Sequence, residues 1–199
     1  MANEFERKQR IGILGGGPGG YEAALAGAQL GADVVLIERA GVGGSAVLTD
    51  VVPSKTLIAT AEAATAIGEA TDVGVQFFAR GESGRPAMPE IAINLSAVNK
   101  RLTGLARQQS EDMGEKLKQA GVRVISGEGR LDGPNKLIAS TGRGGRDFDE
   151  VEVDTIVVSV GASPRVLPTA IPDGERIFTW KQVYNLEAIP EHLIVVGSG

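Results

Sequence analysis

A run of glycines at residues 15–20 constrains the fold of this chain more than any other feature. The run reads Gly-Gly-Gly-Pro-Gly-Gly and satisfies the G-x-G-x-x-G pattern of dinucleotide-binding turns. The apolar residues 11–14 before it are typical of a buried strand, and the alanine-rich residues 21–30 after it favour a helix. Residues 34–38 predict a second strand. Because such crossovers are right-handed, we expect the two strands to be parallel neighbours in an α/β fold.

Each part of the glycine run has its own expected role. Gly15 makes the tight turn, Gly17 lets the backbone approach a pyrophosphate, and Gly20 lets helix and strand pack closely. Pro18 and Gly19 lie where the helix begins, so unpaired N–H groups and the positive end of the helix dipole would face the phosphates. Glycine-rich turns are common, and the specificity of this one comes from the strand before it and the helix after it.

Glu38 ends the second strand about twenty positions after the turn, where a carboxylate accepts hydrogen bonds from ribose hydroxyls. A carboxylate repels a 2′-phosphate, so the site favours FAD or NAD over NADP. Arg39 argues in the other direction, because an arginine beside that acid is one way of accommodating a 2′-phosphate. This single motif leaves open whether the dinucleotide is a flavin or a nicotinamide.

Composition excludes several classes of function. The 199 residues include no cysteine, which rules out disulfides, thiolate nucleophiles and cysteine metal sites, so a redox protein would need a cofactor. A net charge of −5 disfavours nucleic-acid and anionic-membrane partners. The sequence has no convincing metal-ligand spacing, no segment long enough to span a bilayer, and an early apolar run broken by glycines, unlike a signal peptide. We therefore expect a cytoplasmic protein.

The rest of the chain predicts further elements of an α/β domain. Helices are expected over residues 56–70 and 96–120, with loops at residues 41–55 and 73–90. Residues 122–126, 136–140 and 148–153 predict a small antiparallel meander, and residues 155–160 and 193–196 predict two further strands. The expected architecture is a doubly wound, Rossmann-like domain over residues 9–190, followed by the first strand of a second nucleotide-binding domain at residues 191–199.

Residues 43–55 read Gly-Gly-Ser-Ala-Val-Leu-Thr-Asp-Val-Val-Pro-Ser-Lys. This segment resembles the flavin-facing segment of the flavoprotein disulfide reductases, the group that contains dihydrolipoamide dehydrogenase and glutathione reductase, which reads roughly G-G-T-C-x4-C-x-P-S-K. The resemblance covers most of the chain. It includes the first strand–helix–strand unit, the meander, Ser159-Val160-Gly161 in place of a usual Ala-Thr-Gly, and the opening of a second nucleotide motif at Gly197.

The resemblance implies that the first motif binds FAD and that a second motif, largely in sequence beyond Gly199, binds NAD(P)H. Lys55 matches a family lysine beside the flavin N5 and is the expected catalytic residue, since a cation there favours hydride arrival. The resemblance also implies a homodimer for the full-length protein and no activity for residues 1–199 alone. The implied cofactor-binding residues are Gly15, Gly17, Pro18, Gly19, Gly20, Glu38, Arg39, Gly43, Gly44, Ser45, Lys55, Gly129, Ser159, Val160 and Gly161.

Ala46 and Val51 stand at the positions of the two family cysteines. Without that dithiol, disulfide reduction by the family's route is excluded. The segment is similar to that of a cysteine-less branch of NAD(P)H:quinone reductases. We therefore expect an FAD-dependent oxidoreductase that passes a hydride from NAD(P)H through the flavin to a small acceptor, with a quinone as the expected one. A dihydrolipoamide dehydrogenase-like protein and a non-catalytic nucleotide-binding module stay open as alternatives.

Overall fold

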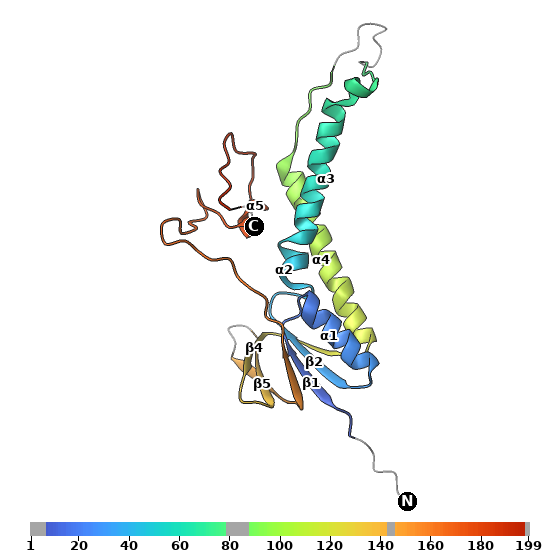
Figure 1. Cartoon of the computed structure of the whole chain (residues 1–199), viewed down its shortest axis with the longest axis vertical. Coiled ribbons are helices and arrows are strands. Elements are labelled where there is room, and N and C mark those ends of the chain that lie inside the picture. Colours follow the sequence, from blue (N-terminus) through green and yellow to red (C-terminus); the bar gives the residue numbers. More distant parts are fainter. Residues whose placement is uncertain (1–6, 79–87, 143–145, 198–199) are drawn as a thin grey trace, which may run out of the picture.

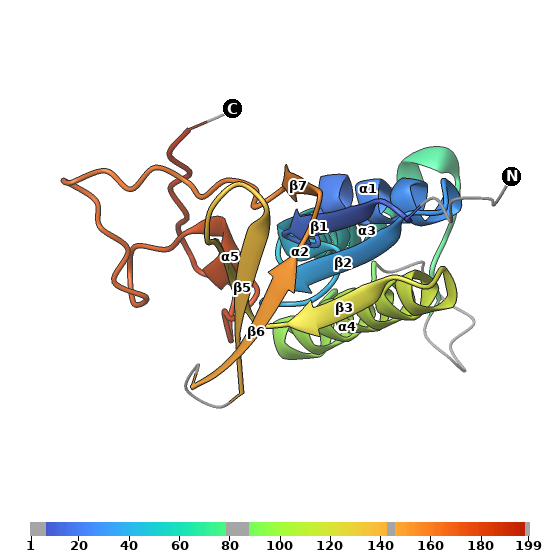
Figure 2. The same ribbon diagram turned by 90° about the horizontal axis from the view of Figure 1, so that it is seen from below.

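A four-stranded parallel sheet forms the centre of the fold. The computed structural model describes residues 7–78, 88–142 and 146–197. The sheet has the order β3-β2-β1-β7, and each neighbouring pair is parallel. Its strands are β1 (Arg10–Leu14), β2 (Asp33–Glu38), β3 (Arg123–Ser126) and β7 (Thr155–Val158). Figure 2 shows the strands of this sheet side by side. The structure therefore confirms the predicted α/β class.

Helix α1 (Pro18–Gln29) connects β1 to β2, as the sequence predicts. It begins directly after the glycine turn, where the Tyr21 N–H donates to the Gly17 carbonyl at 2.8 Å. It ends before Gly31, whose φ of 86° lies in the left-handed region that favours glycine. Its buried face carries Tyr21 and Ala24, which pack in one cluster with Ile13.

Two long helices project from the sheets as a hairpin (Figure 1). They are α3 (Val51–Gly68), which is followed by the 3-10 helix η1 (Ala70–Val73), and α4 (Leu95–Gln119), whose N-cap Asn94 accepts from the Ala97 N–H at 3.0 Å. The predicted loop at residues 41–55 was partly wrong, because α2 (Gly44–Leu48) and the first turn of α3 occupy it. Of the predicted surface loop at 73–90, residues 79–87 lie outside the described residues.

The antiparallel meander comprises β4 (Glu128–Leu131), β5 (Lys136–Thr141) and β6 (Asp147–Glu152), in that order. The prediction that residues 122–126 form its first strand was wrong, since β3 pairs in parallel with β2. Helix α4 brings the chain back along the sheet to the free edge of β2, and a crossover of this kind produces a parallel strand. The actual first strand, β4, has an exposed and glycine-containing sequence that gave little strand signal.

The two faces of the parallel sheet have different partners. One face packs against α1 and α4 through buried residues that include Ile13, Leu36 and Leu117. The other face packs against the meander, with Leu14 and Ile37 in one cluster with Leu137. This division follows from the alternation of side chains along each strand. The meander, rather than a second layer of helices, therefore covers the second face.

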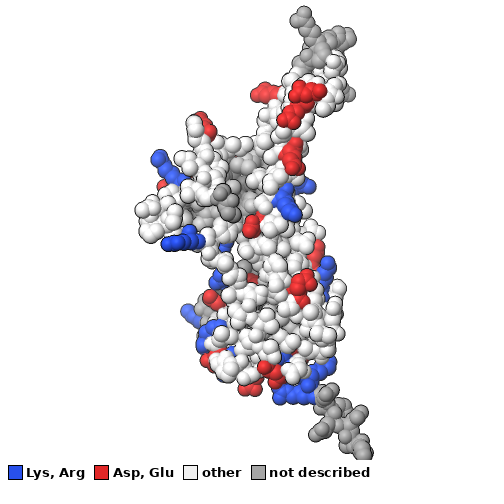
Figure 3. Space-filling model, in the orientation of Figure 1, with Lys and Arg blue, Asp and Glu red and all other residues white. Residues whose placement is uncertain are grey.

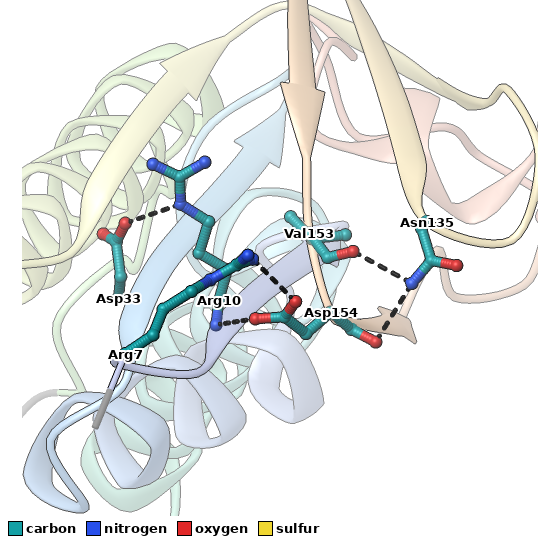
Figure 4. A network of polar contacts seen from close by, with 6 residues as sticks. All are labelled: Arg7, Arg10, Asp33, Asn135, Val153 and Asp154. Atoms are coloured by element: carbon teal, nitrogen blue, oxygen red, sulfur yellow. Dashed lines mark hydrogen bonds and ion pairs between the residues drawn. The ribbon is translucent and has the colours of Figure 1, made fainter. Parts of the chain in front are cut away.

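A polar network joins the two sheets where the parallel strands begin (Figure 4). The Asp154 carboxylate accepts from the Arg7 guanidinium at 2.9 Å and from the Arg10 backbone N–H at 2.8 Å. Arg10 also donates to Asp33 at 3.2 Å, and the Asn135 amide donates to the Val153 carbonyl at 3.0 Å. Figure 3 shows acidic and basic side chains interspersed around this base of the molecule. The network connects the starts of β1 and β2 to the turn that precedes β7.

The chain after β7 has little regular structure and lies beside the helical hairpin in Figure 1. It contains the single turn α5 (Trp180–Val183), and the Asn99 amide of α4 donates to the Leu186 carbonyl at 2.8 Å. The strand predicted at residues 193–196 is not formed in the described chain, where Ile194 is 87% exposed. A strand needs a hydrogen-bonded neighbour, and none is present there. Residues 198–199 lie outside the described residues, and the domain boundary at 190–191 stays a prediction.

Candidate cofactor site

The glycine turn lies at the carboxyl edge of the parallel sheet. The Gly15 N–H donates to the Ile37 carbonyl at 2.9 Å, and the Ser159 N–H donates to the Leu14 carbonyl at 2.8 Å. Gly15 has a φ of 93°, and a Cβ there would collide with the backbone of Ser159. A Cβ on Gly20 would collide with the Gly15 carbonyl. Gly15 therefore makes the tight turn, and Gly20 allows the close packing of helix and strand, as the sequence predicts.

Gly17 differs from these neighbours because its Cβ position is empty. A Cβ built on Gly17 would meet no atom within 4 Å, and Gly17 lines a cavity of about 640 Å³. Helix α1 begins at the next residue, Pro18, which lines the same cavity. Bare backbone and a helix N-terminus thus face open space, which fits the approach of a phosphate group.

Glu38 has a structural role that the sequence reasoning missed. Its Oε2 accepts from the Gly16 N–H at 2.6 Å, and its Oε1 accepts from the Ala40 N–H at 2.7 Å. The carboxylate therefore ties the end of β2 to the glycine turn. Oε1 also accepts a long hydrogen bond from the Gly41 N–H at 3.4 Å, whereas Oε2 keeps a second lone pair. Glu38, which also lines the cavity, therefore keeps capacity for a ribose hydroxyl donor.

Arg39 extends from the same strand end and lies close to the meander. Its guanidinium Nη1 is 3.5 Å from the Glu128 carboxylate, and both side chains are largely exposed. An exposed pair of this kind contributes little to stability. It does, however, give the arginine an acidic partner, which reduces its availability to a 2′-phosphate.

A second glycine segment closes against the first. The Gly43 N–H donates to the Gly16 carbonyl at 2.7 Å, and Gly43 adopts a φ of 98° directly before α2. A Cβ on Gly44 would lie 2.9 Å from the Gly17 Cα. Two backbone loops that are 27 residues apart, from Gly17 to Gly44, are therefore in contact because Gly44 carries no side chain at that point.

The cavity collects most of the residues that the sequence singles out. Gly20 and Gly43 are buried and lie outside its lining, and Lys55 lies on α3 outside its lining with an exposed side chain. Gly129 lines it, and a Cβ there would lie 2.5 Å from Leu14, so glycine also lets β4 cross the end of the sheet. The predicted residues in the lining are Gly15, Gly17, Pro18, Gly19, Glu38, Arg39, Gly44, Ser45, Gly129, Ser159, Val160 and Gly161.

Lys181 is a lining residue that the sequence reasoning missed. It lies on α5, more than a hundred positions after the glycine turn, and no local motif marks it. Near α5, burial raises the pKa of Tyr184, and the Asp50 carboxylate at the start of α3 raises it further. The segment that carries α5 thus reaches the start of α3, where Val51 follows Asp50.

A larger, shallower hollow of about 1010 Å³ lies at the opposite edge of the sheet. It is lined by charged residues of both signs, including Arg10 and Asp154, and by none of the residues predicted to bind a cofactor. Ligands of open parallel sheets bind outside the carboxyl ends of the strands. The smaller cavity is therefore the candidate site.

A parallel sheet with a glycine turn, a helix N-terminus and an acid around one cavity defines a dinucleotide-binding protein. The family model of the pyridine nucleotide-disulphide oxidoreductases matches residues 9–199. The chain belongs to this family. FAD and NAD(P)H are the family's cofactors, in agreement with the prediction from the sequence.

Several known proteins are similar over nearly the whole chain. The NAD(P)H dehydrogenase (quinone) of Mycobacterium tuberculosis is 44% identical over 96% of the chain and 38% of the relative. The dihydrolipoyl dehydrogenase of Chlorobaculum parvum is 34% identical over 95% of the chain and 38% of the relative. The crystal structure of LpdA from Mycobacterium tuberculosis matches with a TM-score of 0.79 at 40% identity, covering 92% of the chain and 38% of LpdA. The chain thus spans somewhat over a third of the length of these relatives.

Membrane-spanning helices and metal-binding clusters are both absent from the residues that the structure describes. None of the helices there combines the length and the apolar character needed to cross a membrane. In the same part of the chain, His, Asp and Glu side chains form no group of three that could hold a metal ion.

Proposed function

We propose that this chain forms the FAD site of an NAD(P)H-dependent oxidoreductase that passes electrons to a small acceptor, with a quinone as the acceptor class. The observation that carries the proposal is the open Cβ position of Gly17 beside the start of α1, in a cavity that Glu38 also lines. Bound flavin would supply hydride acceptance and electron transfer. A homodimeric whole protein in the cytoplasm also belongs to the proposal.

The residues of the chain have separate roles in binding. Gly17 and the first turn of α1 would hold the diphosphate through backbone N–H groups, and Glu38 would accept from ribose hydroxyls. Gly44 and Ser45 begin α2 on the other side of the cavity. Because Glu38 is already held by three backbone N–H groups, its carboxylate is positioned before the cofactor arrives.

The acceptor is inferred from Ala46 and Val51. In place of a dithiol, these positions carry apolar side chains, Ala46 half-buried on α2 and Val51 42% exposed at the start of α3. Apolar surface suits a flat quinone ring better than a charged disulfide substrate. The similarity to a protein named NAD(P)H dehydrogenase (quinone) supports the same acceptor class.

Steady-state turnover of the whole protein tests this function. NADH and NADPH are each supplied with a panel of quinones and, in parallel, with lipoamide and glutathione disulfide. We expect quinone reduction and no disulfide reduction, with ping-pong kinetics if the nicotinamide leaves before the acceptor binds. The similarity to a dihydrolipoyl dehydrogenase makes lipoamide the informative competitor. Brisk lipoamide reduction without quinone activity would contradict the proposal.

Lys55→Met tests the proposed catalytic residue. A cation near the flavin N5 would favour hydride arrival, so we expect its removal to slow flavin reduction by NAD(P)H by on the order of tenfold to a hundredfold, with little change in FAD affinity. Stopped-flow absorbance measures the reduction and a flavin titration measures the affinity. The matched control is Lys116→Met, because Lys116 is an exposed lysine on α4 that does not line the cavity. Equal reduction rates in the two variants would remove Lys55 from the mechanism.

A further inference from the structure

Lys181 brings a positive charge to the candidate site from a distant part of the sequence. It lines the cavity together with Gly17, Pro18 and Gly19 of the glycine turn. Figure 2 shows α5, which carries Lys181, beyond the arrowheads of β1 and β2, at the carboxyl edge of the sheet. The lysine and the N-terminus of α1 therefore belong to the same cavity.

The other charged residues in the lining already have partners. Glu38 accepts from the Gly16 and Ala40 N–H groups, and Arg39 lies 3.5 Å from Glu128. Lys181 takes part in none of the ion pairs of the described residues. The Lys181 ammonium, which has an aromatic ring but no carboxylate as its neighbour among these residues, and the positive end of the α1 dipole are thus the positive charges that this part of the chain presents to the cavity. Both favour an anion.

Local contacts hold both the backbone and the side chain of Lys181 in place. Thr179 and Gln182 form a capping box at the start of α5, with the Thr179 N–H donating to the Gln182 side chain at 2.8 Å. The Lys181 ammonium lies 5.5 Å from the centre of the Trp180 ring, within the range of a cation–π interaction. Four residues after Gln182, the Leu186 carbonyl accepts from Asn99 of α4. The lysine is therefore anchored on both sides in sequence.

We propose that Lys181 binds the diphosphate of the FAD and thereby positions the cofactor. This inference rests on the proposed function. The diphosphate is the part of FAD that carries negative charge, and the glycine turn places its expected position in the cavity that Lys181 lines. Lys181 is then a positioning residue whose charge compensates one phosphate while the backbone N–H groups of α1 hold the other contacts.

Binding of FAD, ADP and adenosine to the full-length apoprotein tests the inference. Lys181→Gln should weaken FAD and ADP binding by about tenfold, the effect of a lost hydrogen bond to a charged group. It should leave adenosine binding unchanged, because adenosine has no phosphate, and it should make the salt dependence of FAD affinity shallower. Lys181→Arg keeps the charge and should retain most of the affinity. Lys116→Gln is the matched control for the loss of one surface charge.

Three outcomes would overturn the inference. Equal FAD and ADP affinities in Lys181→Gln and Lys116→Gln, with a parent protein that binds FAD, would show that Lys181 does not contact the diphosphate while the proposed function stands. If Lys181→Gln weakened adenosine binding as much as FAD and ADP binding, the substitution would act on the cavity as a whole and not on contact with the diphosphate. A parent apoprotein that binds neither FAD nor ADP would overturn the proposed function, and this inference with it.

Discussion

At the scale of single residues, the glycines of the turn at residues 15–20 are needed for different physical reasons. Gly15 has a positive φ and Gly20 lies against a carbonyl, so both are required by the folded backbone. Gly17 has an ordinary φ of −65° and free space around its Cβ position, so the folded chain alone does not require glycine there. A requirement for glycine at this position would come from a ligand.

Gly17→Val therefore separates binding from folding. We expect the variant to fold with a loss of about 1 kcal/mol or less, since valine is a poorer N-cap than glycine, and to bind FAD on the order of a hundredfold more weakly. Thermal denaturation and flavin titration measure the two effects. Gly20→Val is the contrasting variant and should fail to fold stably, because its side chain would overlap the Gly15 carbonyl. Normal FAD affinity in Gly17→Val would contradict the assigned phosphate position.

At the scale of elements, short turns outside the sheets are stabilised by individual polar side chains. The Asp173 carboxylate accepts from the backbone N–H groups of Glu175, Arg176 and Ile177 at 2.8 to 2.9 Å. These bonds lower the pKa of Asp173 from 3.8 to about 2, and the bond from the Ile177 N–H has the largest effect. The turn between Ile171 and α5 is therefore held by an ionised carboxylate.

The pH dependence of this turn follows from the lowered pKa. Its stabilisation is complete above about pH 4 and is lost as the pH falls through about 2, because protonation removes the favoured charged acceptor. NMR titration of the amide signals of residues 175–177 should give a common midpoint near 2. Asp173→Asn cannot ionise and should remove the transition. A midpoint at the ordinary 3.8 would mean that the three bonds do not form in solution.

At the scale of the whole molecule, the packing of one sheet on the other supports the candidate site. Leu137 of β5 is fully buried in the cluster between the two sheets, together with Leu14 and Ile37 at the ends of β1 and β2. The glycine turn follows Leu14 directly, and Glu38 follows Ile37. The meander thus holds the strand ends from which the site extends.

Leu137→Ala should destabilise the protein by about 2 to 5 kcal/mol, the cost of a cavity at a fully buried leucine. Leu131→Ala is the matched control, because Leu131 is 52% exposed on β4 and should cost far less. Chemical denaturation gives both values. We also expect FAD affinity to fall in Leu137→Ala and to hold in Leu131→Ala. Similar stabilities for the two variants would contradict the inter-sheet core.

The local sequence determined the elements whose signals are short in range. The strand, glycine turn, helix and acid of residues 11–38 were predicted within a few positions, because buried strands, tight turns and helix starts depend on neighbouring residues. The family was also recognisable from the order of its motifs. These motifs named most of the residues that line the cavity.

Only the tertiary structure decided the rest. Residues 123–126 join the parallel sheet rather than the meander because α4 returns the chain to the edge of β2, a fact that no local pattern carries. Glu38 ties down the glycine turn and Lys181 reaches the cavity from α5, and both depend on contacts across long stretches of chain. Pairing partners and cavity linings are set by which distant segments meet, whereas local propensities act over only a few residues.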